Sequence, residues 1–186
     1  MILELESPLN RMTADHPSSI LMEWMEAYGQ DVWNYAYYLT KRRDAADDIS
    51  QDVFLKALVS LRQFEGRSSV KTWLFAITRN LSMNYLRSSF IKKVTLIGMP
   101  AFARSERSAE MEAIGKQEIS RIWQHVMSLP VKFREVLVLE FHYQLPRSET
   151  ASLLGISEGT VKSRLHRARK RMEALLKGDE DDEQSK

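Results

Sequence analysis

The sequence of 186 residues contains no cysteine. Disulfide scaffolds, cysteine-ligated zinc sites and thiol catalysis are therefore excluded. Long apolar runs are also lacking, because no stretch approaches the ~18 consecutive apolar residues of a transmembrane helix. The opening residues, MILELESPLNRM, lack the basic start and the apolar block of a signal peptide. We therefore expect a cytoplasmic protein.

Glycine and proline are scarce, at 7 and 5 residues, and no segment alternates polar and apolar residues for long. Apolar residues instead recur at three- and four-residue spacing, which predicts an all-α fold. The expected helices cover about 19–40, 44–61, 70–87, 113–128, 131–143, 148–154 and 158–176. Gly29 is a candidate break in the first of them, and Leu55 is expected in the core of the second.

A weakly patterned segment, 89–112, divides these helices into two groups. Residues 1–88 and 113–177 are therefore expected to form two small helical domains joined by a flexible linker. Residues 178–186 hold 5 acidic residues and 1 basic residue, and are expected to be a disordered acidic tail.

The formal net charge is only +2, but the charges are sorted along the chain. Residues 1–61 carry 5 basic and 10 acidic residues, whereas 62–93 carry 7 basic and 1 acidic. Residues 158–177 carry 7 basic and 2 acidic residues. Two separate basic blocks suit two contacts with a polyanion such as nucleic acid. Ordinary solvated basic faces are the alternative.

The strongest local motif is RSETASLLGISEGTVKSRLHRARKRM, which predicts a helix-turn-helix at the end of the second domain. Ala151 lets two helices approach, Gly155 turns the chain and Val161 packs back. Ser157 is placed to cap the second helix, whose basic faces suit the major groove of DNA. A helical hairpin with a solvated basic face is the alternative. Thr150 stands where an apolar residue is usual, so looser packing is expected there.

The third expected helix has a polar row beside its apolar stripe. Asn80, Asn84 and Arg87 align at about 100° per residue, and Trp73 lies on the same side. Basic residues mixed with aromatic rings and amides favour single-stranded DNA, because bases stack on rings and amides bond unpaired base edges. The preceding loop, which starts at Phe64, is suited to hold a flipped-out base. The alternative is that Trp73 belongs to the core.

The second expected helix is acidic, with Asp44, Asp47, Asp48 and Asp52 and no basic residue until Lys56. Aspartate is a poor helix former in mid-helix positions, so helix stability does not explain this cluster. An acidic face on a DNA-binding protein favours a basic protein partner. A solvated face is the alternative.

Together, these parts resemble an extracytoplasmic-function (ECF) sigma factor of bacterial RNA polymerase. The family's polymerase-clamp-binding helix is similar to DAADDISQDVFLKAL, and its −10 recognition and melting segment is similar to FEGRSSVKTWLFAITRNLSMNYLR. Its −35-binding domain is similar to LPVKFREVLVLEFHYQLPRSETASLLGISEGTVKSRLHRARKRM. The match spans about residues 20–177, and segment 89–112 is too short for a middle sigma domain. The resemblance implies that this segment threads the polymerase near its active centre.

The resemblance also implies three sets of contact residues. Those that would bind the polymerase clamp are Asp47, Asp48, Gln51 and Asp52. Those that would handle the −10 strand are Phe64, Ser68, Ser69, Lys71, Trp73, Asn80, Asn84 and Arg87. Those that would read or hold the −35 duplex are Glu158, Thr160, Lys162, Ser163, Arg164 and Arg167. The family often has an acidic residue at the position of Asn84, so −10 specificity is expected to differ or an internal pairing to be lost.

The implied partners are core RNA polymerase, promoter DNA and an anti-sigma factor, which in this family is often membrane-anchored. No small-molecule substrate, cofactor or metal is implied. A conventional regulator of LuxR type is the alternative, because SEGTVKSRL also resembles its helix-turn-helix. Such a regulator would carry a receiver or ligand-binding domain in place of residues 44–87. An enzyme is disfavoured, because nucleotide-binding and hydrolase motifs are missing and the four histidines are isolated.

Overall fold

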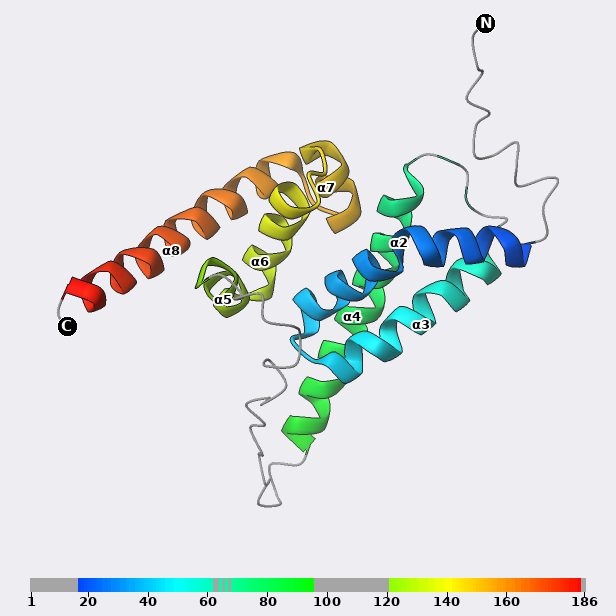
Figure 1. The fold of residues 1–186 in the computed structure, drawn as a ribbon, viewed down its shortest axis with the longest axis horizontal. Coiled ribbons are helices and arrows are strands. Elements are labelled where there is room, and N and C mark those ends of the chain that lie inside the picture. The colour runs from blue at the N-terminus through cyan, green and yellow to red at the C-terminus, as the bar shows by residue number, and fades with distance from the viewer. Residues whose placement is uncertain (1–16, 62–63, 65, 67, 96–120, 185–186) are drawn as a thin grey trace, which may run out of the picture.

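The computed structural model describes residues 17–61, 64, 66, 68–95 and 121–184, and within these ranges it is all-helical (Figure 1). This confirms the expected fold class. The helices are α2 (Pro17–Thr40), α3 (Arg43–Ser60), α4 (Val70–Thr95), α5 (Arg121–Ser128), α6 (Val131–Leu137), the π-helical turn η3 (Val138–His142), α7 (Arg147–Leu154) and α8 (Glu158–Gln184). We call α2–α4 the N-terminal unit and α5–α8 the C-terminal unit.

In the N-terminal unit, α2 and α3 lie side by side and α4 crosses them (Figure 1). Its core is made of small and branched side chains with an exposed fraction of 0%, among them Val32, Ala36, Ala46, Val53, Ala57 and Leu74. Small residues on facing helices allow close approach of the backbones, which explains the tight pairing of α2 with α3.

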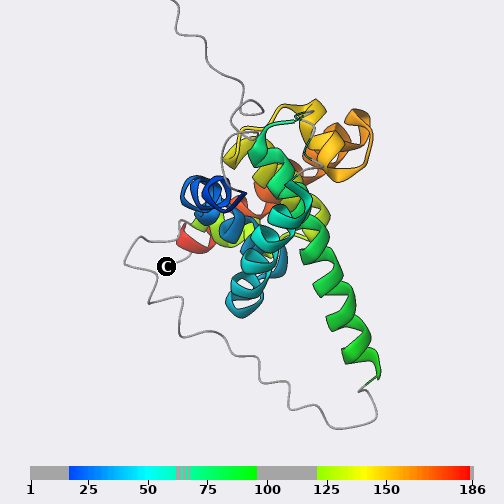
Figure 2. The same cartoon turned by 90° about the vertical axis from the view of Figure 1, so that its right-hand side faces the viewer.

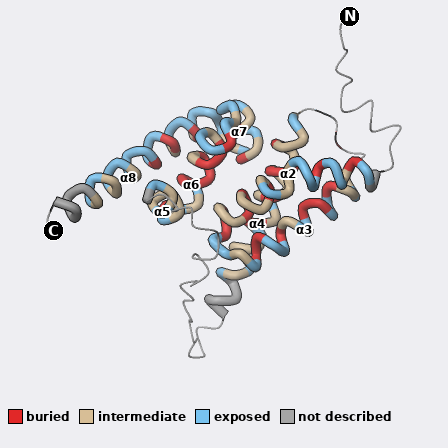
Figure 3. The backbone as a smooth tube through the Cα atoms, in the orientation of Figure 1, coloured by how far each residue is buried: buried red, intermediate tan, exposed pale blue. Residues whose placement is uncertain are grey.

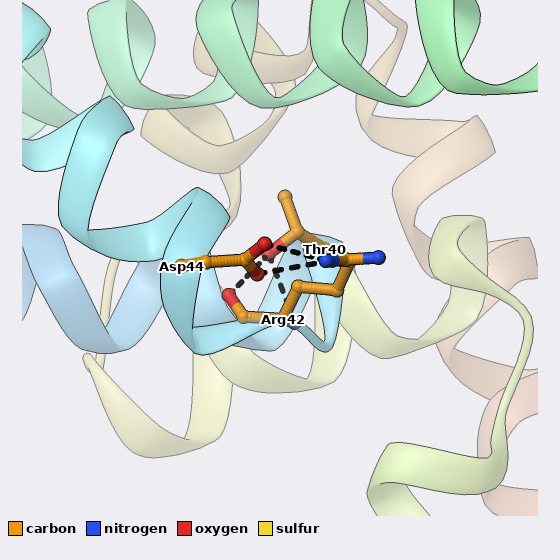
Figure 4. Close-up of polar contacts among 3 residues, drawn as sticks. All are labelled: Thr40, Arg42 and Asp44. Carbon is orange, nitrogen blue, oxygen red and sulfur yellow. Dashed lines mark hydrogen bonds and ion pairs between the residues drawn. The ribbon is translucent and has the colours of Figure 1, made fainter. Parts of the chain in front are cut away.

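The turn from α2 to α3 is held by local polar contacts (Figure 4). Lys41 adopts φ 59°, and its N–H donates to the carbonyl of Tyr37 over 2.8 Å. The hydroxyl of Thr40 donates to the carbonyl of Ala36 over 2.9 Å. Arg42 Nε donates to the Asp44 carboxylate over 3.0 Å, and this bond lowers the pKa of Asp44. The acidic residue in the first turn also complements the dipole of α3.

The helix-turn-helix forms as the residue spacing predicts. Gly155 ends α7 with φ 65°, and the N–H of Ile156 returns to the carbonyl of Ala151 over 3.1 Å. Ser157 Oγ accepts the N–H of Thr160 over 3.2 Å, which caps α8. Val161 is fully buried between the two helices. Thr150 is also fully buried, and its hydroxyl finds no partner in the described part of the chain.

The two units share a continuous apolar cluster. Tyr35, Leu39 and Phe75 of the N-terminal unit pack with Leu139 and Tyr143 of the C-terminal unit. The helix α7 lies against α4, and α6 lies against α2 (Figures 1 and 2). Buried positions accordingly follow α6 and the inner sides of α2 and α3, whereas much of α8 is exposed (Figure 3).

Several sequence-based boundaries differ from the structure. Gly29 does not interrupt α2, and Leu55 is 60% exposed rather than buried. Because no Gly or Pro follows Arg87 until Gly98, α4 continues to Thr95 and enters the segment expected to be linker. The rest of that segment lies outside the described residues, as does the expected helical stretch 113–120.

The acidic tail is also different from the expectation. The described residues of 178–186 are helical, because α8 runs through Gly178 to Gln184. An ion pair of 2.7 Å between His125 Nε2 and the Asp179 carboxylate docks this extension onto α5. The segment expected to be a disordered tail is therefore drawn as helix as far as Gln184.

Candidate polymerase and nucleic-acid interfaces

The acidic residues predicted to bind the polymerase clamp lie on the outer face of α3. Asp47, Asp48, Gln51 and Asp52 are all exposed. Asp47 differs from the others because its carboxylate accepts the indole N–H of Trp33 over 2.6 Å. The other three side chains project from the same side of the helix at three- and four-residue spacing, so one partner surface can contact them together.

Two exposed apolar residues extend this acidic face. Leu55 and Val59, one and two turns beyond Gln51, are 60% and 85% exposed. Residue-by-residue hydrophobicity placed Leu55 in the core, although its four-residue spacing from Gln51 and three-residue spacing from Asp52 already set it on the acidic face. An acidic face with an apolar end fits a basic partner that also buries apolar side chains.

The acidic face and the polar row of α4 border one groove of about 540 Å³. Its lining residues are Asp52, Leu55, Lys56, Val59, Ser60, Ile77 and Asn80. This arrangement brings a predicted clamp-binding residue, Asp52, and a predicted −10 residue, Asn80, to the same groove.

The predicted −10 residues divide between two sides of α4. Asn80, Asn84 and Arg87 are exposed in one row, and Trp73 is half-buried at the start of the same side. Lys71 instead lies between α2 and the C-terminal unit, with its Nζ 2.7 Å from the Asp31 carboxylate of α2 and 5.0 Å from the ring centroid of Tyr143 in the C-terminal unit. The structure therefore separates Lys71 from the polar row.

The aromatic residues of the −10 segment pack with one another. Phe64 is 8% exposed, and its ring centroid lies 6.1 Å from that of Trp24 and 5.0 Å from that of Trp73. A ring enclosed in this way has little free face for a base. These contacts favour a role in the hydrophobic core, and not in base stacking, for Phe64 and for the enclosed side of Trp73.

The two serines before α4 have different surroundings. Ser69 Oγ accepts the N–H of Thr72 over 3.1 Å and lies 2.9 Å from its hydroxyl, so Ser69 caps α4. Ser68 Oγ donates to the carbonyl of Ser69 over 3.3 Å. Both hydroxyls support the start of α4, which presents the polar row.

The predicted −35 residues lie at the start of α8. Glu158, Lys162, Ser163 and Arg167 are exposed, and the hydroxyl of Thr160 lies 2.9 Å from that of the capping Ser157. Arg164 points inward instead, with its Nη1 3.1 Å from the carboxylate of the buried Glu135. Arg164 is therefore committed to a contact within the protein.

His166 also lies in this interface, although it is not among the residues that the resemblance implies for the −35 duplex. Lys162, Ser163, His166, Arg167 and Lys170 follow one exposed side of α8 at three- and four-residue spacing. That spacing was the available signal, and it would have favoured His166 over Arg164.

A basic groove of about 480 Å³ continues this side of α8 toward α6. It is lined by Pro130, Lys132, Phe133, Arg167, Lys170 and Arg171. The Arg171 guanidinium lies 4.9 Å from the centroid of the buried Phe133 ring, and Lys132 Nζ lies 5.2 Å from it. Cations held at defined positions beside an exposed basic helix are suited to hold phosphates.

Comparison with known proteins assigns both units. The family model of sigma-70 region 2 matches residues 24–89, and that of sigma-70 region 4 matches residues 119–172. The chain is 32% identical to the ECF RNA polymerase sigma factor SigM of Bacillus subtilis over 162 residues, covering 87% of this chain and 98% of SigM. It is also 32% identical to SigC of Mycobacterium tuberculosis over 165 residues, covering 88% of this chain and 85% of SigC.

Two solved structures have a similar fold. One is the sigma factor RpoE of Bartonella quintana in complex with the anti-sigma factor NepR, with a TM-score of 0.69 and 26% identity over 84% of this chain and 96% of RpoE. The other is CnrH in complex with the cytosolic domain of CnrY, with a TM-score of 0.66 and 24% identity over 92% of this chain and 95% of CnrH.

The helix-turn-helix unit and the matched regions 2 and 4 define a sigma-70-type transcription initiation factor. Within that class, the chain belongs to the ECF RNA polymerase sigma factors. The alternative of a LuxR-type regulator is not supported, because region 2 stands where such a protein would carry its receiver or ligand-binding domain. None of the described helices is both long enough and apolar enough to cross a membrane.

Proposed function

We propose that this sigma factor binds core RNA polymerase through the outer face of α3. Asp48, Gln51 and Asp52 supply charge and hydrogen bonds, while Leu55 and Val59 supply apolar contact area. Asp47 contributes its charge from a position set by Trp33. The observation that carries this proposal is the exposed acidic and apolar face, which lies within the region 2 match and shares a groove with the polar row of α4.

The polar row of α4 is the proposed contact with the −10 strand. Asn80 and Asn84 offer amide donors and acceptors to unpaired bases, and Arg87 offers a cation to the backbone. Ser68 and Ser69 act at the N-terminal end of the helix, Trp73 offers its outer edge, and Phe64 supports Trp73 from the core. Lys71 contributes only after it leaves Asp31, because the ion pair occupies it.

The N-terminal end of α8 is the proposed reader of the −35 duplex. Glu158, Thr160, Lys162 and Ser163 stand on its first turns, where base edges come within reach of a recognition helix. Arg167 stands one turn further, with His166 beside it, and both suit the phosphate backbone. Arg164 holds the helix in place through Glu135.

The proposed role includes no chemistry of its own, because phosphodiester synthesis belongs to core polymerase. It also places the protein in the cytoplasm, where polymerase and promoters are. An anti-sigma factor, membrane-anchored or not, is the proposed regulator. Support comes from RpoE, which was solved in complex with the anti-sigma factor NepR.

Run-off transcription with purified core polymerase tests this function. Genomic promoter fragments are transcribed with and without the protein, and the 5′ ends of the products are sequenced. We expect new start sites that share two spaced elements upstream. The same start sites with and without the protein would contradict the proposal.

A further inference from the structure

Two adjacent charged residues of α6 lie buried where the two units meet. Arg134 and Glu135 are each only 3% exposed. Burial of charged groups is unfavourable unless they are paired and hydrogen-bonded. Their partners therefore show which arrangement of the units the sequence favours.

Arg134 joins the carboxyl ends of two helices, one from each unit. Its Nη1 donates to the carbonyls of Met127 and Leu129, both over 2.9 Å, near the end of α5. Its Nη2 donates over 3.0 Å to the carbonyl of Leu39, at the end of α2. A cation at a helix carboxyl end satisfies free carbonyls and complements the helix dipole.

Glu135 also contacts both units. One carboxylate oxygen lies 3.2 Å from Arg79 Nε of α4, and the other lies 3.1 Å from Arg164 Nη1 of α8. Arg79 is only 21% exposed, so this ion pair is largely shielded from solvent. Neighbouring bonds support it, because Thr72 donates to Glu149 over 2.7 Å and Tyr143 donates to the carbonyl of Asp31 over 2.9 Å.

We propose that Arg134 and Glu135 form a latch that holds the two units in a closed state, which must open before both units engage one promoter. The consequence for promoters rests on the proposed function. Elements named −35 and −10 are about 25 base pairs apart, which is about 85 Å of duplex at 3.4 Å per base pair. A compact chain of 186 residues has a radius of gyration of about 16 Å. The α4 and α8 surfaces, held within one packed core, cannot reach both elements.

The chemistry of the latch makes it reversible. When the units separate, water replaces the protein partners of Arg79, Arg134 and Glu135, so the lost ion pair is largely compensated. Separation also removes the Tyr143 ring from Lys71, which keeps its ion pair with Asp31 because both residues belong to the N-terminal unit.

Single-molecule energy transfer on the full chain tests the latch directly. Since the sequence has no cysteine, Glu26→Cys on α2 and Ser152→Cys on α7 place two dyes at exposed positions of the two units. We expect mainly high energy-transfer efficiency in the unbound protein, because the closed state keeps the two dyes close together. Arg79→Met removes the contact across the interface and leaves the Arg164–Glu135 pair intact. It should raise the ratio of open to closed molecules about fivefold, as expected for loss of one coupled pair.

Glu135→Gln should raise the ratio of open to closed molecules by a similar factor. The double variant, with Arg79→Met and Glu135→Gln, should open little further than either single variant. The matched control is Glu140→Gln, which also removes a carboxylate of the C-terminal unit but breaks a pair with Arg147 of the same unit. It should leave transfer unchanged. Low transfer in the unsubstituted protein, or unchanged transfer in both Arg79→Met and Glu135→Gln, would overturn the latch. The energy-transfer measurement requires neither polymerase nor DNA. If the variants open as expected but run-off transcription fails, the proposed function is rejected and the latch is retained.

Discussion

Trp33 donates its indole N–H to the carboxylate of Asp47 over 2.6 Å, joining α2 to the acidic face of α3. The same indole stacks on Tyr37, with ring centroids 5.5 Å apart, and has the Arg43 guanidinium 5.9 Å from its centroid. Asp47 is thereby tied to its own protein, whereas Asp48, one residue later, points outward. Adjacent aspartates therefore have different expected effects on polymerase binding.

Asp48→Arg should abolish binding to core polymerase while the fold remains intact. Asp48 is exposed, so the substitution disturbs no packing but places a cation where the proposed partner is basic. We expect at least a tenfold loss of affinity, measured by fluorescence anisotropy of labelled protein titrated with core. Glu23→Arg, which reverses an exposed charge on α2, is the control. Unchanged affinity of Asp48→Arg would reject the clamp assignment.

Leu55→Ser should weaken core binding without lowering stability. A side chain that is 60% exposed contributes little to folding, but an interface that buries it gains apolar area. The melting temperature should stay within a few degrees of that of the unsubstituted protein. The affinity for core polymerase should fall about tenfold. Met22→Ser, at a 69% exposed position of α2, should leave both unchanged. A large loss of stability in Leu55→Ser would instead show that Leu55 belongs to the hydrophobic core.

Helical periodicity predicted most of the fold because apolar residues recur at three- and four-residue spacing along the chain. It could not predict contacts between helices that are far apart in sequence, since these depend on how the helices pack together. Lys71 illustrates this: nothing near it in sequence shows that Asp31 and Tyr143 occupy it. Arg164 is similar, because its partner Glu135 lies 29 residues away. The apolar character of Leu55 also led to a wrong prediction, because this residue lies on an exposed face and not in the hydrophobic core.

Phe64→Ala should lower the free energy of unfolding by about 3–5 kcal/mol. The ring is 8% exposed and packs between Trp24 and Trp73, so its removal leaves a cavity in the N-terminal unit. Denaturant unfolding followed by tryptophan fluorescence measures the change. Phe90→Ala, at a 68% exposed position of α4, should change stability by less than about 0.5 kcal/mol. Similar stability of the two variants would instead favour Phe64 as a free stacking surface.

Arg167→Ala should mainly weaken DNA binding, whereas Arg164→Ala should mainly lower stability. Arg167 is exposed, so its loss should weaken binding to a −35 duplex by a similar factor across sequences and lower the salt dependence of binding by about one unit of slope. Arg164 pairs with buried Glu135, so its loss should reduce stability by about 1–2 kcal/mol. Anisotropy titrations at several salt concentrations and thermal melts separate these effects. Altered base preference with unchanged stability in Arg164→Ala would return Arg164 to the set of base-reading residues.

Stability should fall as the pH drops below about 6.5, the usual pKa of histidine. His142 lies against Tyr38, Trp123 and Tyr143, and partial burial lowers its pKa, which favours the neutral ring in the folded state. Nearby Lys71 acts in the same direction, whereas Asp31 opposes it. The unfolded chain therefore takes up a proton first as pH falls, and folding loses free energy between that pKa and the lower folded one.

Melting temperatures of the full chain between pH 8 and pH 5.5 measure this effect, because most carboxylates stay ionised over that range. His142→Gln should flatten the profile, since the amide does not titrate there. His166→Gln, at an exposed position of α8, should keep the profile of the unsubstituted protein. If His142→Gln retains the full pH dependence, the acid sensitivity arises elsewhere in the chain. If it flattens, the lowered pKa of His142 in the aromatic cluster that joins the two units accounts for the acid sensitivity.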